Sequence, residues 1–262
     1  ILVSLDHERT AQELSSALQE THAEAGVLVE FDVGFHRCGL EPGPQCVELA
    51  KKIESLPGLV FRGLMTYFGN VWGTPEQRSV EALQVAERVG RALESFTNAG
   101  IRVEIVSGGS TPSAEFAHLV RGLTEIRPGT YVYNDLNTYH QGACRLEDCA
   151  ARVVTTVVST AVPGRAILDA GSKTLSSDLL RAGPSSGYGL VVEAPNAPLI
   201  KLNEEHGHVD VTQSSHRFEV GEVVTVIPNH VCTCVNLQDE VFLVRNEQVV
   251  GCWRVAARGK TR

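Results

Sequence analysis

The sequence predicts an α/β fold, in which part of a parallel βα barrel is followed by a mostly antiparallel β domain. Two changes of pattern along the 262 residues support this prediction. Up to residue 148, short β-branched runs alternate with longer segments of helical periodicity, as is typical of parallel βα units. After Asp148, strand-like runs are separated by Gly and Pro, and helical periodicity nearly vanishes. We therefore predict two domains, residues 1–148 and 149–262.

The first domain contains five candidate βα units. Its predicted strands are residues 2–5, 27–32, 60–65, 102–106 and a shorter one near 130–133. Its predicted helices are residues 9–24, 44–55, 75–99 and 112–119, and the last three each begin with a proline, which a first helical turn tolerates. Because a closed barrel has eight units, we predict a (β/α)8 TIM-type barrel whose first strands are missing. The chain also begins inside its first predicted strand, so we expect an N-terminal portion upstream of Ile1.

The second domain contains a series of strand-like runs. These runs are residues 151–162, 166–169, 188–192, 223–228 and 241–244. Their spacing, with Gly and Pro between them, favours antiparallel connections over βα crossovers. We therefore predict a mostly antiparallel β domain.

Composition limits the partners of the protein. Hydrophobic residues make up 43% and charged residues 21%, and 23 Lys and Arg against 31 Asp and Glu give a formal net charge of −8. This acidic balance disfavours nucleic acid and anionic membranes as partners. No apolar run reaches the roughly 20 residues that cross a bilayer, and no signal-peptide pattern is present. We expect a cytoplasmic protein whose seven cysteines are free thiols or metal ligands.

Two neighbouring loops of the first domain have the composition of an anion site. Residues 107–112, Ser-Gly-Gly-Ser-Thr-Pro, follow a predicted strand and open a predicted helix, where backbone amides can bind a phosphate. The alternative is a glycine-rich turn with a Ser/Thr cap. Residues 127–130, Arg-Pro-Gly-Thr, lie in the next loop, and the loops after the last two strands of a βα barrel frequently bind phosphate. Two such loops together favour phosphate binding.

Two further residues lie where predicted strands end at the same edge. Arg37 is flanked by Gly34 and Gly39 in the loop after the second strand, and it can meet a ring hydroxyl or a carboxylate. Tyr67 ends the next strand and can stack on a ligand or hydrogen-bond to it. The alternatives are a solvated loop arginine and a core tyrosine.

In the β domain, His230 and Cys232 lie two residues apart at the end of a predicted strand. Residues i and i+2 of a strand project from one face, so both side chains can bind one zinc ion. The alternative is a core cysteine beside a polar histidine. Cys234 has the same spacing and stays a candidate ligand, and residues 204–208, Glu-Glu-His-Gly-His, are either another metal-binding cluster or a solvated loop.

Six segments occur in a fixed order along nearly the whole chain. They are Asp32-Val33-Gly34 with Arg37-Cys38-Gly39, Ser107-Gly108-Gly109-Ser110-Thr111-Pro112, Glu125-Ile126-Arg127-Pro128-Gly129-Thr130-Tyr131, Asp169-Ala170-Gly171-Ser172-Lys173, Glu204-Glu205-His206-Gly207-His208 and Pro228-Asn229-His230-Val231-Cys232. Together they resemble the fold-type III pyridoxal phosphate enzymes, in the group of D-serine dehydratases and D-threonine aldolases related to alanine racemase. Each segment is moderately specific alone, but the ordered set is specific.

The resemblance implies a barrel that holds pyridoxal phosphate at its mouth, a β domain, and a homodimer with active sites near the interface. Arg37 and Tyr67 would be catalytic residues near the cofactor ring or the substrate. The metal site would be His230 and Cys232, a pair that resembles the zinc-dependent dehydratases, whereas the aldolases tend to have aspartate at the second position. The cofactor-binding residues would be Gly108, Gly109, Ser110, Thr111, Arg127, Gly129, Thr130 and Tyr131.

The resemblance also implies a Schiff-base lysine on the first barrel strand, upstream of this chain. None of the five lysines present has an equivalent place: Lys51, Lys52, Lys173, Lys201 and Lys260. Lys173 lies in a shared segment of the β domain, and we expect it to have a structural or surface role. This chain alone is therefore expected to be inactive.

The resemblance implies a pyridoxal phosphate-dependent lyase that acts on β-hydroxy-D-amino acids. The main prediction is a D-serine dehydratase that forms pyruvate and ammonia, with zinc activating the β-hydroxyl. One alternative is aldolase cleavage of Cα–Cβ to glycine and an aldehyde, as in D-threonine aldolase. The other is a non-catalytic chain that lacks the Schiff-base lysine and binds a phosphorylated ligand.

Overall fold

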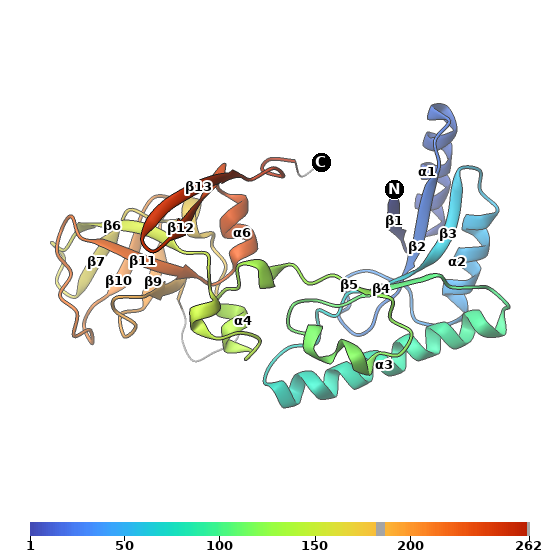
Figure 1. Cartoon of the computed structure of the whole chain (residues 1–262), viewed down its shortest axis with the longest axis horizontal. Coiled ribbons are helices and arrows are strands. Elements are labelled where there is room, and N and C mark those ends of the chain that lie inside the picture. Colours follow the sequence, from blue (N-terminus) through green and yellow to red (C-terminus); the bar gives the residue numbers. More distant parts are fainter. Residues whose placement is uncertain (182–186, 261–262) are drawn as a thin grey trace. The chain divides into compact units, whose positions relative to one another are not determined.

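The computed structural model describes residues 1–181 and 187–260. Contacts within the chain divide it into two compact units, Ile1–Gly129 and Thr130–Arg262 (Figure 1). The predicted domain boundary at residues 148 and 149 lies inside the second unit, between its first short helices and its first strand, and it stays a prediction. No helix among the described residues is long and apolar enough to cross a membrane.

The first unit is built on a five-stranded parallel sheet in which strands adjacent in sequence are neighbours (Figure 1). Its strands are β1 (Leu2–Leu5), β2 (Ala25–Glu30), β3 (Leu59–Met65), β4 (Ile105–Gly108) and β5 (Glu125–Ile126). Helices α1 (Glu8–Thr21), α2 (Pro44–Glu54) and α3 (Pro75–Asn98) connect the first four strands. Because every strand runs in the same direction, the loops that follow them all leave from one edge.

Local sequence signals fix the longest of these helices. Thr74 caps α3 by accepting a hydrogen bond from the Gln77 amide, Gln77 Oε1 accepts one from the Thr74 amide, and Pro75 occupies the first turn. Further along, the apolar face of α3 packs on the sheet, where the rings of Phe61 and Phe96 stack with centroids 5.4 Å apart. The cap and the apolar face together position the loop between β3 and α3.

The end of the sheet differs from the sequence prediction. The fifth strand is β5, and residues predicted as a strand near 130–133 instead include a 3₁₀ turn, η2 (Thr130–Val132). The Arg127 amide still donates to the carbonyl oxygen of Gly108 at 3.1 Å, but Pro128 has no N–H to continue the ladder. The predicted helix at 112–119 is a 3₁₀ helix, η1 (Ala114–Leu119), and β4 lies later than expected, so Ser107 and Gly108 belong to the strand itself.

The second unit is built on a six-stranded antiparallel sheet in the order β8-β11-β6-β7-β10-β9. The strands are β6 (Val153–Ser159), β7 (Arg165–Leu168), β8 (Gly189–Val191), β9 (Leu199–Leu202), β10 (Gly207–Asp210) and β11 (Val223–Pro228). The amide of Tyr188 donates to the carbonyl oxygen of Leu199 at 2.9 Å, so the two ends of the sheet adjoin and form a nearly closed barrel. The predicted fold class, a parallel α/β unit followed by an antiparallel β domain, is confirmed.

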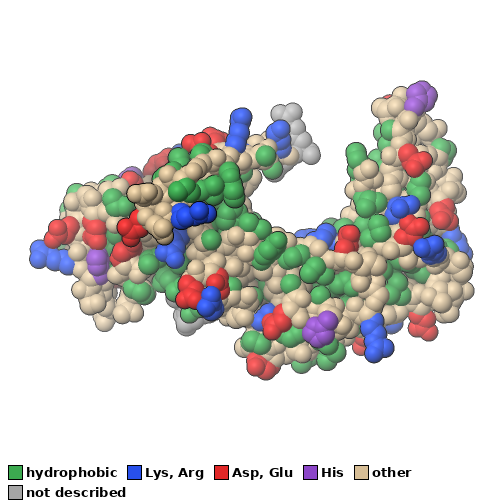
Figure 2. All heavy atoms as spheres, in the orientation of Figure 1, with side chains coloured by type: hydrophobic (Ala, Val, Ile, Leu, Met, Phe, Trp, Pro, Cys, Tyr) green, Lys and Arg blue, Asp and Glu red, His purple; other side chains and the backbone are tan. Residues whose placement is uncertain are grey.

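Side-chain alternation explains the core of the β domain. Along β11, Val224 and Val226 are fully buried in the core. Val223 points to the opposite face of the sheet and is 60% exposed. A separate hairpin of β12 (Glu240–Arg245) and β13 (Gln248–Arg254) follows, and the short helices of the unit are α4 (Leu136–His140), η3 (Leu146–Asp148), α5 (Ser172–Leu175) and α6 (Val231–Asn236). Sequence patterns did not predict β9, β10, β13 or the helices of this unit. On the face shown in Figure 2, acidic and basic side chains are interspersed over both units, without a single-sign patch.

Candidate active site

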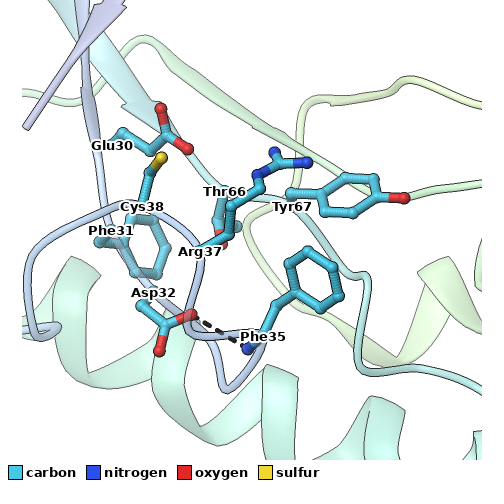
Figure 3. Close-up of a pocket in the computed structure, with 8 residues that line it drawn as sticks. All are labelled: Glu30, Phe31, Asp32, Phe35, Arg37, Cys38, Thr66 and Tyr67. Carbon is cyan, nitrogen blue, oxygen red and sulfur yellow. Dashed lines mark hydrogen bonds between the residues drawn. The ribbon is translucent and has the colours of Figure 1, made fainter.

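A pocket in the first unit lies where β2 and β3 end (Figure 3). Its lining residues are Glu30, Phe31, Asp32, Phe35, Arg37, Cys38, Thr66 and Tyr67. The loop after β2 is closed at its base, because the Asp32 amide donates to the Leu40 carbonyl oxygen at 2.9 Å and the Leu40 amide donates to that of Glu30 at 3.0 Å. The pocket therefore occupies the strand edge at which the sequence predicts the ligand.

Asp32 holds this loop in one conformation. Its Oδ1 accepts hydrogen bonds from the Phe35 amide at 3.0 Å (Figure 3) and from the His36 amide at 2.9 Å, and its Oδ2 lies 2.7 Å from His36 Nδ1. Burial raises the pKa of Asp32, but the amide hydrogen bonds and His36 outweigh burial, so the pKa lies below its ordinary value. Gly39 closes the loop at φ +104°, where a Cβ would lie 2.5 Å from the Phe31 carbonyl carbon. The loop is therefore fixed around Arg37.

Arg37 is held by aromatic rings. Its guanidinium carbon lies 4.6 Å from the ring centroid of Tyr67 and 5.5 Å from that of Phe35, and the two rings meet edge to face (Figure 3). Within the described residues Arg37 forms no ion pair, and its side chain is exposed. The structure thus brings together the two residues predicted as catalytic, and it leaves a cation at the pocket that can bind an anionic group. Their catalytic role stays a prediction.

Arg127 ties three strand ends together behind the pocket. Its guanidinium donates to the carbonyl oxygen of Thr66 at 2.9 Å and to the hydroxyl of Ser107. Burial lowers its pKa below the ordinary value for arginine, though the group stays cationic at neutral pH. Thr66 lines the pocket, and its buried hydroxyl has no hydrogen-bond partner among the described residues. Sequence reasoning missed Thr66, although it directly precedes Tyr67 at a strand end.

The glycine-rich loop packs closely against its neighbours. A Cβ on Gly108 would lie 2.8 Å from the Phe68 ring, and Gly109 has φ +94°. The Ser110 amide donates to the Ser113 hydroxyl at 2.8 Å, and the two hydroxyls lie 3.0 Å apart. The loop therefore has the tight backbone that a phosphate site requires. The Ser113 hydroxyl, which sequence reasoning missed, accepts the hydrogen bond from the Ser110 amide.

The His230 and Cys232 side chains of the second unit are in contact, but not through the predicted strand geometry. β11 ends at Pro228, His230 is the N-cap of α6, and Cys232 lies in the first helical turn, so the expectation that both project from one strand is wrong. The chain leaves the strand because Asp135 Oδ2 accepts a hydrogen bond from the Val231 amide at 3.0 Å and begins the helix. The turn brings the imidazole and thiol within hydrogen-bond reach of each other.

These contacts activate the thiol. The hydrogen bond with Cys232, opposed by burial and assisted by Asp178, raises the pKa of His230 to about 9. The same hydrogen bond lowers the pKa of Cys232, which favours the thiolate that binds metal. Thr130 Oγ1 lies 3.7 Å from Cys232 Sγ, so two predicted site residues from distant parts of the sequence meet here. Asp178 was missed because nothing in the sequence pairs it with a histidine 52 residues away.

The other candidate ligands are separate from this pair. Cys234 is buried, its thiol donates to the Thr174 carbonyl oxygen at 3.2 Å, and burial raises its pKa to about 11. Glu204 and Glu205 form ion pairs with Lys173 at 2.9 and 2.8 Å, which agrees with a surface role for that lysine. Among the described residues, no group of three or more His, Cys, Asp or Glu side chains could hold a metal ion. A metal at His230 and Cys232 would therefore leave other positions to water or substrate.

Comparison with known proteins identifies the family of this chain. The alanine racemase N-terminal domain matches residues 1–137, and the serine dehydratase domain matches residues 150–244. The chain belongs to the alanine racemase-like family. The resemblance drawn from the six sequence segments is thereby confirmed. This branch of the family comprises pyridoxal phosphate-dependent aldolases and dehydratases of D-amino acids.

Within the family, the chain is 32% identical to a D-threonine aldolase from Arthrobacter sp over 268 residues, which cover 100% of this chain and 68% of the aldolase. It is 29% identical to the D-serine dehydratase of Dictyostelium discoideum over 250 residues, 86% of this chain and 62% of that protein. The chain thus spans about two thirds of the length of these relatives.

The solved structure of D-threo-3-hydroxyaspartate dehydratase from Delftia sp. HT23 superposes with a TM-score of 0.88 at 28% identity, covering 97% of this chain and 71% of that one. Two mutants of that dehydratase have also been solved. One replaces a histidine by alanine, and the other, in a metal-free form, replaces the cysteine two residues later.

Proposed function

We propose that this protein is a pyridoxal phosphate-dependent D-serine dehydratase, which converts D-serine to pyruvate and ammonia. The observation that carries the proposal is the placement of His230 and Cys232 at the N-terminus of α6, where Asp178 contacts the imidazole and Thr130 lies 3.7 Å from the thiol. A histidine and a cysteine at the same spacing have been replaced in the Delftia dehydratase, and the cysteine mutant is metal-free. A D-serine dehydratase, that of Dictyostelium discoideum, is among the relatives of this chain.

The residues of the first unit fit pyridoxal phosphate. Among the described residues, the Thr66 hydroxyl has no hydrogen-bond partner and the Arg37 cation no ion pair, and together with the rings of Phe35 and Tyr67 they suit an anionic aromatic cofactor. We propose that the loop residues Gly108, Gly109, Ser110, Thr111 and Gly129 hold the phosphate and that Arg127 faces the ring. For Thr130 and Tyr131, which open the second unit, cofactor binding stays a prediction.

When bound, pyridoxal phosphate supplies an electron sink for negative charge that develops at Cα. Arg37, fixed by the Asp32 loop and by the Tyr67 ring, would bind the substrate carboxylate or the cofactor hydroxyl. Tyr67 Oη would donate or accept a hydrogen bond at the same pocket.

The donor set of the second unit fits a divalent cation. His230 Nδ1 is engaged with Asp178, so Nε2 is the ring nitrogen left to bind a metal beside the Cys232 thiolate. One imidazole and one thiolate suit zinc better than a hard cation, and a zinc ion there would supply Lewis acidity. We therefore propose zinc as the metal.

D-threonine aldolase chemistry is the second candidate. The Arthrobacter aldolase covers the whole chain, and it is 32% identical. Product analysis with the full-length protein, loaded with zinc and cofactor, separates the two activities. We expect D-serine to yield pyruvate and ammonia in equal amounts; glycine and acetaldehyde from D-threonine, with no pyruvate from D-serine, would instead indicate the aldolase. Turnover of neither compound would favour the non-catalytic alternative.

We also propose a cytoplasmic homodimer that acts on small D-amino acids. Light scattering of the protein after size exclusion tests the oligomeric state. A mass of twice that of the protein supports the proposal, and a monomer that keeps full activity contradicts it.

A further inference from the structure

Asp178 lies beside His230, although it belongs to a different segment of the second unit, the one that follows α5. Its backbone is fixed on both sides. The Asp178 amide donates to the Ser176 hydroxyl at 3.2 Å, and the Asp178 carbonyl oxygen accepts a hydrogen bond from Asn229 Nδ2 at 3.0 Å. Asn229 is 3% exposed and directly precedes His230. The residue next to the histidine thus also sets the position of the carboxylate.

One oxygen of Asp178 makes two contacts with the segment that carries His230. Oδ2 lies 2.6 Å from His230 Nδ1 and accepts a hydrogen bond from Thr233 Oγ1 at 2.7 Å. Thr233 Oγ1 in turn lies 3.1 Å from both the Ser176 hydroxyl and the His230 carbonyl oxygen. Asp178 Oδ2 is therefore a shared acceptor for the imidazole N–H of His230 and the hydroxyl of Thr233.

A carboxylate at this place decides which nitrogen of the imidazole carries a proton. Nδ1 must be protonated to donate to Asp178 Oδ2, so the lone pair of a neutral His230 lies on Nε2. The contact also restricts rotation of the ring, whose other side meets Cys232. Carboxylates that accept the second N–H of a metal-binding histidine raise its basicity and orient its ring.

We propose that Asp178 is a positioning residue, which holds the His230 ring so that Nε2 and the Cys232 sulfur can bind one zinc ion. The inference rests on the proposed function, because it concerns the metal site of that proposal. It adds a residue that does not touch the metal, and it assigns the Thr233 hydroxyl the role of fixing the carboxylate.

The experiment measures zinc affinity, by competition with a chromophoric chelator, in the full protein and five variants. Asp178→Asn is expected to weaken zinc binding about 10- to 100-fold, since loss of such an outer partner typically has that effect. Thr233→Val is expected to weaken it less. Asp169→Asn is the matched control, because Asp169 also accepts hydrogen bonds from a threonine hydroxyl, Thr155 Oγ1 at 2.5 Å, and from a backbone amide. It lies outside this network and should leave zinc affinity unchanged.

A cobalt spectrum separates positioning from general damage to the fold. In the Co²⁺-loaded protein, Asp178→Asn should keep the thiolate-to-cobalt band from Cys232 but shift the d–d bands, because the imidazole changes its orientation. Asp178→Glu keeps a carboxylate and should restore part of the affinity. Equal zinc affinity and equal cobalt spectra in Asp178→Asn, Thr233→Val and the original protein would overturn the inference alone. His230→Ala is the fifth zinc variant, and if its affinity equals that of the original protein, the metal site and the proposed function fail with it.

Discussion

Arg37 is surrounded by two aromatic rings and has no carboxylate partner among the described residues. A guanidinium of this kind keeps its hydrogen-bonding capacity for a ligand while its plane is held by ring contacts. Cys232 is the corresponding residue of the second unit, since its thiolate is favoured by His230 and it is exposed. These two side chains give the residue-scale predictions.

Arg37→Ala is expected to lower kcat/KM for D-serine about 10- to 100-fold, because one charge-assisted hydrogen bond to an anionic group is lost. Arg37→Lys should recover part of this loss, since it keeps the charge but not the planar fork. Steady-state kinetics of pyruvate release measure the effect. Arg91→Ala is the control, because Arg91 pairs only with Glu87 on the surface of α3. Equal losses in Arg37→Ala and Arg91→Ala would contradict a ligand contact for Arg37.

Cys232→Asp is expected to shift metal preference from zinc towards a harder cation such as manganese, because carboxylate oxygen replaces thiolate sulfur. Metal content after dialysis against equal zinc and manganese, measured by atomic emission, reports the shift. Cys234→Ser is the matched control, as that buried thiol contacts the Thr174 carbonyl oxygen. An unchanged preference in Cys232→Asp would count against ligation by Cys232.

At the scale of elements, the loop from Asp32 to Gly39 is the part of the first unit that most constrains the pocket. Backbone hydrogen bonds to Leu40 hold the two ends of the loop together, and the Asp32 carboxylate accepts hydrogen bonds from two amides within it. A Cβ added at Gly39 would lie too close to the backbone atoms of Phe31 and Asp32 for another residue to fit. The loop therefore depends on one glycine.

Gly39→Ala is expected to destabilise the protein by more than the about 1–2 kcal/mol that a left-handed conformation costs an L-residue, because its Cβ also clashes with backbone. Gly221→Ala is the matched control, since Gly221 has φ +90° but no atom lies within 4 Å of its added Cβ. Denaturant unfolding of both variants measures the difference. If Gly39→Ala lowers the unfolding free energy no more than Gly221→Ala does, the loop can shift to accommodate the added Cβ.

Sequence periodicity predicted the elements that have strong local signals and missed those that depend on distant partners. The cap at Thr74 and the apolar face of α3 are readable from adjacent residues, and that helix lies close to its predicted range. The 130–133 segment has the β propensity of Thr, Tyr and Val, yet it turns because the Thr130 carbonyl oxygen accepts hydrogen bonds from the amides of Tyr133 and Asn134. The geometry of α6 likewise depends on Asp135, which lies 96 residues before Val231 in the sequence.

The candidate site shows the same division. Residues next to strand ends, such as Arg37, Tyr67 and His230, were recognisable as candidates from their positions. Asp178 was not recognisable, because its segment has no periodic pattern and its partner comes from a different strand-to-helix turn. Supporting residues are therefore the part of a site that a single sequence shows least.

At the scale of the whole molecule, each unit contains a carboxylate whose pKa the fold lowers. Burial raises the pKa values of Asp32 and Asp169, but hydrogen bonds from backbone amides, and from Thr155 for Asp169, outweigh burial. A folded pKa below the unfolded one means that the stabilisation is complete above the unfolded pKa, about 4, and is lost as pH falls through the folded pKa.

Unfolding free energy should therefore fall as the pH is lowered from about 4 towards 2. Asp32→Asn should reduce stability by about 1–3 kcal/mol at pH 7, whereas Asp169→Asn should reduce it less, because the Asp169 side chain is exposed and solvent screens its charge. Both deficits should shrink as the pH falls through the folded pKa of each carboxyl group. Denaturant titrations between pH 2 and pH 7 measure this. A variant whose deficit is the same at both pH values would show that the charge of that carboxylate contributes nothing.

Asp135 shares its two oxygens between two helices. Oδ1 accepts a hydrogen bond from the Thr138 amide at the start of α4, and Oδ2 accepts one from the Val231 amide at the start of α6. Asn137 reinforces the link, because its Nδ2 donates to the Asn229 carbonyl oxygen at 2.7 Å. The partners in the second segment are backbone groups, so this link depends on the side chains of Asp135 and Asn137 and not on those of residues 229 and 231. A substitution at Asp135 would therefore disturb the start of α6 although it lies 96 residues away in the sequence, because one carboxylate begins two helices.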